Sequence, residues 1–187
     1  KTVGQNIAIT ARSSQNANLR LFLNGAEIAT QANATTLSAN PIITSAGNQQ
    51  IIAEAENRGT LVKDTINFFV NDATVIEEVP AGAKDGINYD ASGTAATLVL
   101  YAPNKGNLMV VGDFNNWTQQ SAYQMKRTPD GQRYWLTITG LTPGQEYAYQ
   151  NIIDGTLKVA DYNANKILDP WNDHYINEAP YANRYPN

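Results

Sequence analysis

The sequence predicts an all-β protein made of two β-sandwich domains in tandem, followed by an extended C-terminal arm. Short runs of alternating apolar and polar residues recur along the chain, which is the pattern of half-buried strands. Asn-Gly and Asp-Gly pairs, which favour tight hairpins, separate several of these runs. No stretch of the sequence holds the sustained apolar period of a helix. Six or seven short strands for each domain favour a sandwich of two sheets.

The first domain is expected over residues 1–76, with six or seven short strands. Alternating apolar residues stand on both sides of Asn24-Gly25 and of Asn57-Arg58-Gly59. Each of these two turns therefore predicts a hairpin.

Residues 77–84 are expected to form a linker, because this short stretch carries glutamates, a proline and a glycine and offers little that could pack. The second domain is expected over residues 85–162, with seven strands. Its expected features include a short edge strand within residues 124–127, a strand over residues 146–153 and a hairpin closed by Asp154-Gly155.

The arm is expected over residues 163–187, where the strand period stops and Asn, Pro and Tyr become frequent. Nothing in this region closes a fold, so we expect the arm to lead into a further domain that the sequence does not contain. The sequence does not begin with a secretion signal, so we expect any such signal to have been removed or to lie outside it.

The composition excludes several classes of function. The net charge of -4 and the lack of a basic patch argue against nucleic acid as a partner. No window reaches the length of a membrane span. With no cysteine and a single histidine, His174, the sequence predicts no disulfide, no metal site and no cofactor. We also expect no catalytic residues, because the acidic side chains fall in turns rather than as a facing pair.

One stretch organises the second domain. Residues 110–117 read as a buried strand that Gly112 breaks into a polar turn, which Trp117 closes. The turn contains residues whose short side chains can bond nearby backbone, namely Asp113, Asn115 and Asn116. Downstream follow, at fixed offsets, Tyr134-Trp135, Gly140-Leu141-Thr142-Pro143-Gly144, Tyr147-Ala148-Tyr149, Asp154-Gly155 and Asp161.

With these motifs, the region from Asp85 to Asp173 resembles the early-set module at the N-terminus of branching enzymes, isoamylases and pullulanases, known as carbohydrate-binding module family 48. The resemblance implies an immunoglobulin-like sandwich that accompanies the catalytic barrel of an α-amylase-family glycoside hydrolase. Residues 1–76 resemble, more generically, the immunoglobulin-like modules that precede catalytic domains in bacterial secreted polysaccharide hydrolases.

The resemblance also implies candidate sugar contacts, because glucan-binding members of the family use two tryptophans, a lysine and an asparagine. The first tryptophan falls on Trp117, the lysine on Gln150 and the second tryptophan on Leu157. This sequence therefore lacks the lysine and the second tryptophan of the family pattern. The candidate carbohydrate-binding residues are Trp117, Asn115, Asn116 and Gln150. The alternative for Trp117 is packing against a neighbouring domain, which we favour.

The arm resembles the segment that joins such modules to the catalytic barrel. Its aromatics are too many for a free linker, and we expect them to dock on the absent domain: Trp171, Tyr175, Tyr181 and Tyr185.

The resulting expectation is a pair of non-catalytic modules from an exported bacterial α-glucan hydrolase, periplasmic, extracellular or on the cell surface, which position or stabilise its catalytic domain. One alternative is an independent module that binds starch, glycogen or maltooligosaccharide through Trp117. A second alternative is a non-enzymatic, immunoglobulin-like surface or adhesion protein.

Overall fold

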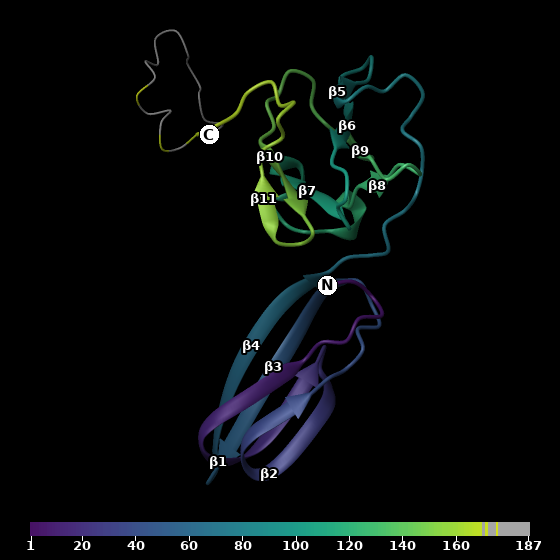
Figure 1. Ribbon diagram of the computed structural model, residues 1–187. Helices are drawn as coiled ribbons and strands as arrows, with labels where there is room; N and C mark the ends of the chain where they lie inside the picture. The colour runs from purple at the N-terminus through teal and green to yellow at the C-terminus, as the bar shows by residue number, and fades with distance from the viewer. Residues whose placement is uncertain (170, 172–174, 176–187) are drawn as a thin grey trace. The chain divides into compact units, whose positions relative to one another are not determined.

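The computed structural model describes residues 1–169, 171 and 175, and almost all of its regular structure is β-strand (Figure 1). The predicted all-β class is thereby confirmed. The chain divides into two compact units, Lys1–Ala73 and Thr74–Asn187. Within the described part of the chain, no helix has the length and apolar character needed to cross a membrane.

The first unit is an antiparallel sheet of four long strands in the order β2-β1-β3-β4 (Figure 1). The strands are β1 (Ile9–Leu23), β2 (Ala26–Ala39), β3 (Gly47–Asn57) and β4 (Thr60–Val70). The prediction of six or seven short strands here is wrong for the described residues. Runs that the sequence separates by polar residues are continuous, since β1 and β2 pair along nearly their whole length.

A register irregularity lets this long hairpin form a core. The pairing of β1 with β2 shifts between Arg12 and Ala17, where the strands are irregular. Residues from both sides of this irregularity share one apolar cluster, in which Leu37 packs with Leu19 and Leu21. The two predicted hairpin turns are confirmed, with left-handed backbone at Asn24 (φ 51°) and Gly25 (φ 82°) in the first.

Within its described residues, the second unit has seven strands in two antiparallel sheets. One sheet has the order β5-β6-β9-β8, with β5 (Gly86–Tyr89), β6 (Ala95–Tyr101), β8 (Lys126–Arg127) and β9 (Arg133–Thr139). The other has the order β11-β10-β7, with β7 (Leu108–Gly112), β10 (Tyr149–Ile153) and β11 (Leu157–Val159). Two short 3-10 turns follow β7, η1 (Asp113–Asn115) and η2 (Ser121–Tyr123). The predicted edge strand and the Asp154-Gly155 hairpin are confirmed.

The two sheets of the second unit share one core. Alternate residues of β6 and β9 face inward as cross-strand pairs, such as Leu98 opposite Leu136. They meet Leu108 and Val110 of β7, which are fully buried. This arrangement is a sandwich, because each sheet buries one face against the other.

The junction between the expected first domain and the expected linker, at residues 76 and 77, is fixed to the second unit. Ile76 forms a parallel bridge with Arg127, and the Glu77 N–H donates to the Arg127 carbonyl at 2.9 Å. The Trp135 indole donates to the Glu77 carbonyl at 3.0 Å, and the Lys126 ammonium lies 4.4 Å from the ring centre of Trp135. Residues 76–77 therefore pair with β8 at the edge of its sheet.

Candidate functional site

The turn after β7 depends on a close approach of two backbone segments. Gly112 is extended (φ -179°), so its backbone would suit any residue. A Cβ at this position, however, would lie 2.4 Å from the Ala148 carbonyl oxygen and 2.8 Å from the Tyr149 Cβ. Only glycine therefore lets the turn pack directly against the start of β10.

Asn115 holds this turn from the inside. Its side chain is buried, with 3% of its surface exposed. Its Oδ1 accepts the Gly112 N–H at 2.9 Å, and its Nδ2 donates to the Val110 carbonyl at 3.1 Å. The prediction that Asn115 contacts carbohydrate is therefore wrong, since its amide serves the backbone. Asn116 is exposed and adopts left-handed backbone (φ 54°), as its turn role requires.

The Trp117 indole is held in one orientation by hydrogen bonds and is still partly exposed to solvent. Its backbone N–H donates to the Gly112 carbonyl at 3.0 Å, and its Nε1 donates to Asp113 Oδ1 at 2.9 Å. The other carboxylate oxygen of Asp113 accepts the Ala148 N–H at 2.6 Å. Nevertheless 46% of the Trp117 surface is exposed. A flat ring held in this way is suited to stack on a sugar or on another protein surface.

The other two positions of the family pattern differ in their surroundings. Gln150 lies on β10 opposite Val111, is half-buried and lines the same groove as Trp117. Leu157 begins β11, is 55% exposed and does not line that groove. The structure thus brings Trp117 and Gln150 together but leaves Leu157 outside the groove.

A groove of about 470 Å³ opens between the sheets at this end of the second unit. Inward-facing residues of the sheet β5-β6-β9-β8 form part of its lining: Ile87, Ala96, Leu98 and Ile138. Aromatic residues contribute the ring surfaces that line it, namely Tyr89, Phe114, Trp117, Tyr147 and Tyr149. We name this feature the intersheet groove. The sequence prediction missed it.

The loop before β10 forms one side of the intersheet groove. The strand predicted over residues 146–153 begins only at Tyr149, so that part of the prediction is wrong. Tyr147 instead turns back, and its hydroxyl accepts the Thr142 N–H at 2.9 Å. This contact holds residues 142–147 in a closed loop that is not paired with either sheet.

The segment 160–168 lines the other side of the groove and is tied down by side chains. The Tyr149 hydroxyl donates to the buried carboxylate of Asp161 at 2.8 Å. Asn165 Nδ2 donates to the Tyr89 hydroxyl at 3.2 Å, and Lys166 lies 3.2 Å from Glu146. Burial, together with the nearby carboxylate, raises the pKa of Tyr149 well above its usual value.

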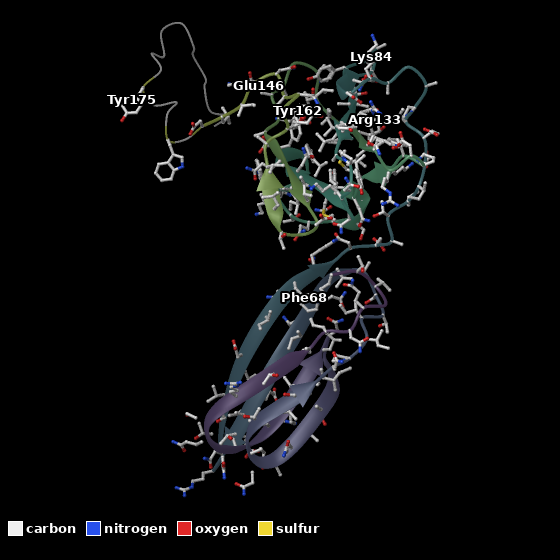
Figure 2. The ribbon with its side chains drawn as sticks, viewed as in Figure 1. Phe68, Lys84, Arg133, Glu146, Tyr162 and Tyr175 are labelled. Carbon is white, nitrogen blue, oxygen red and sulfur yellow. The ribbon has the colours of Figure 1, made fainter. Side chains whose placement is uncertain are left out.

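The aromatics predicted for docking lie at and beyond the end of this segment. Trp171 and Tyr175 are each 82% exposed, and Tyr175 lies beyond the strands of the second unit (Figure 2). Tyr181 and Tyr185 lie outside the described residues. Among the described residues, no group of three or more His, Cys, Asp or Glu side chains could hold a metal ion.

A sandwich with an oriented, exposed tryptophan at a sheet end has the features of a carbohydrate-binding module. Residues 85–172 match the family described as carbohydrate-binding module 48, the isoamylase N-terminal domain.

The curated relatives that match are branching enzymes. The chain is 30% identical over 85 residues to the 1,4-alpha-glucan branching enzyme of Synechococcus sp. strain JA-2-3B'a(2-13), covering 46% of this chain and 9% of that enzyme. It is 42% identical over 52 residues to the branching enzyme of Butyrivibrio fibrisolvens, covering 28% of this chain and 8% of that enzyme. The chain therefore spans less than a tenth of the length of either relative.

The solved structures that the chain resembles include a pullulanase. The chain resembles the pullulanase SAP of Group B Streptococcus in complex with maltotetraose, with a TM-score of 0.39 and 12% identity, over 95% of this chain and 24% of that one. It also resembles the fibronectin(III)-like modules of Clostridium thermocellum CbhA, with a TM-score of 0.35 and 13% identity, over 85% of this chain and 83% of that one.

Proposed function

We propose that the chain is a non-catalytic part of a secreted, α-glucan-acting glycoside hydrolase of the α-amylase family. Residues 85–172 position or stabilise the catalytic domain, which follows the segment after Leu168. The family match and the names of the branching-enzyme relatives support an α-glucan context.

The observation that carries the docking role is the exposure of Trp171 and Tyr175. Each leaves 82% of its surface uncovered, directly after a segment that is fixed to the second unit. Large aromatic side chains displayed together are typical of surfaces that another protein covers. Burying both rings against a following domain would stabilise that domain by about 2–4 kcal/mol.

The test uses the full natural polypeptide. Replacing both Trp171 and Tyr175 by alanine should lower the midpoint of thermal unfolding of the catalytic domain by several degrees. Tyr162→Ala is the control, because Tyr162 is also an exposed aromatic but lies within the segment that is already fixed to the second unit. An unchanged catalytic-domain midpoint in the double variant contradicts the docking role.

A second candidate function is direct binding of α-glucan by Trp117, with starch, glycogen or maltooligosaccharide as the ligand. The oriented and half-exposed indole favours it. Electrophoresis of the 187-residue chain in gels that contain amylopectin tests this function. Retardation that Trp117→Ala abolishes and Trp171→Ala preserves would establish Trp117 as the glucan contact, whereas equal migration of all three proteins in the presence and absence of amylopectin would contradict it.

The export of the parent protein belongs to the same proposal, and fractionation of the source cells tests it. A third function, that of a non-enzymatic immunoglobulin-like surface or adhesion protein, is separated from the first two by the gene. A reading frame that continues into a barrel of repeated strand-helix units supports the hydrolase, and one that lacks such units favours adhesion.

A further inference from the structure

We propose that the intersheet groove is the socket in which the following catalytic domain inserts an apolar side chain. This inference rests on the proposed function, and it names the surface and the chemistry of the contact. The groove would thus supply the central anchor of the docking interface, with the exposed aromatics of the segment beyond it as additional contacts.

The chemistry of the groove suits an apolar occupant. Ile87, Leu98 and Ile138 belong to the inner face of their sheet, where a sandwich normally covers such side chains with its second sheet. Leu98 and Ile138 are buried and belong to the floor of the groove, and Ile87 is half-buried. The groove lies where residues 142–147 form a loop instead of extending β10. Apolar side chains offer a sugar hydroxyl no hydrogen-bond partner, whereas they favour an aliphatic or aromatic group.

The polar contacts lie at the margin of the groove. The Lys166–Glu146 ion pair joins the segment on one side to the loop on the other, and both side chains are partly exposed to solvent. Trp117 and Gln150 complete a mixed polar and aromatic border. An apolar centre surrounded by polar and aromatic residues is the arrangement found around the anchor residues of protein interfaces.

The course of segment 160–168 brings the following domain close to the intersheet groove. Segment 160–168 forms one wall of the groove and is held there through Asp161, Asn165 and Lys166. The polypeptide therefore leaves the second unit beside the groove. A following domain would be tethered to this unit through the residues after Leu168, at an effective concentration of about millimolar, so even a weak apolar contact would be occupied.

Hydrogen–deuterium exchange tests the proposal by comparing the full polypeptide with the 187-residue chain. In the full polypeptide, the amides of residues 141–148 should exchange at least about tenfold more slowly, because the inserted side chain covers the loop. The comparison is repeated on the 187-residue chain with maltoheptaose as a sugar probe.

Two variants of the full polypeptide sharpen the test. Ala164→Glu puts a carboxylate into the groove from its wall and so disfavours an apolar occupant, whereas Ala91→Glu adds the same charge at an exposed position that does not line the groove. Protection of residues 141–148 that is lost in Ala164→Glu and kept in Ala91→Glu supports the proposal.

Three other results overturn it. If only residues near Trp171 and Tyr175 gain protection, the domain docks without the groove, and the proposed function survives alone. If no residue of the chain gains protection, the socket and the docking role both fail. If maltoheptaose protects residues 141–148 in the 187-residue chain, the occupant of the groove is a sugar and not a side chain.

Discussion

Replacing Gly112 by alanine is the sharpest test of how the candidate site is built. The new Cβ would meet the Ala148 carbonyl oxygen at 2.4 Å and the Phe114 ring at 2.9 Å, and both neighbours are held in place. Overpacking of this kind costs about 1–3 kcal/mol. Moving Ala148 away would also break its 3.0 Å bond from the Asp113 N–H, at about 1 kcal/mol.

The reduced freedom of the unfolded chain offsets about 0.4–1 kcal/mol of this loss. The expected net destabilisation of the second unit is about 3 kcal/mol, or a fall in melting temperature of about 10–20 °C for a domain of this size. Tryptophan fluorescence during urea unfolding measures it selectively, because all three tryptophans lie in the second unit.

Gly106→Ala is the matched control. There the new Cβ would meet a single atom, Asp154 Oδ1 at 3.1 Å, which ends a rotatable side chain. Its cost should stay below about 1 kcal/mol. If Gly112→Ala unfolds within about 1 kcal/mol of the wild type, or if both variants lose the same stability, the close approach does not determine the turn.

Three further predictions concern single side chains. Asn115→Ala should destabilise the second unit by about 2–4 kcal/mol in the same fluorescence assay, because it leaves two buried backbone groups unpaired, whereas the exposed Asn116→Ala should cost about 1 kcal/mol. Tyr149 has a raised pKa in the folded state, so an unfolded chain loses that proton first and stability should fall as pH rises above about 10. Unfolding free energies at pH 8 and pH 11 should show a shallower fall in Tyr149→Phe; an equal fall contradicts the assignment. Leu157→Trp restores the second tryptophan of the family pattern at an exposed position. If that pattern applies here, the affinity for amylopectin measured by gel retardation should rise about fivefold to tenfold, or by about 1–1.4 kcal/mol. Unchanged migration contradicts this.

Local turn chemistry made the fold class predictable from the sequence. Asn24-Gly25 and Asp154-Gly155 need left-handed backbone, which these residue types adopt at low cost, and the structure has it at both sites. The turn type fixes the pairing of the adjacent strands, so the hairpins followed directly. The continuity of β1 was not predictable in this way, because the polar residues 13–16 look like a break. They form the irregular stretch of one strand whose flanking parts both pair with β2.

The candidate site was only partly predictable. Trp117 was recognised from its place at the end of a polar turn, and its exposure agrees with that reading. Asn115 was misassigned, since an asparagine in a turn has the same appearance in sequence whether it faces solvent or bonds the backbone inside. Its position three residues after Gly112 was the available indication, because short polar side chains commonly bond backbone a few residues away.

The intersheet groove had no indication in the sequence, because it results from contacts between distant segments. Tyr147 and Tyr149 alternate as in a strand, and only the bond from the Thr142 N–H to the Tyr147 hydroxyl shows that the chain turns back before β10. The wall formed by residues 160–168 depends on Asp161 meeting Tyr149, a pairing that local patterns do not specify.

The turn that ends at Trp117 and the loop beside the intersheet groove are linked by one side chain. A variant of that side chain would therefore affect both. A single carboxylate, that of Asp113, accepts both the Trp117 indole N–H and the Ala148 N–H, which belongs to the loop beside the groove. Asp113→Asn would keep the size of this side chain but weaken both bonds, since bonds to a charged acceptor are the stronger ones. A loss of glucan retardation in that variant would therefore not separate sugar stacking from docking. Trp117→Ala does separate them, because it removes the ring and leaves the bond from Ala148 to Asp113 in place.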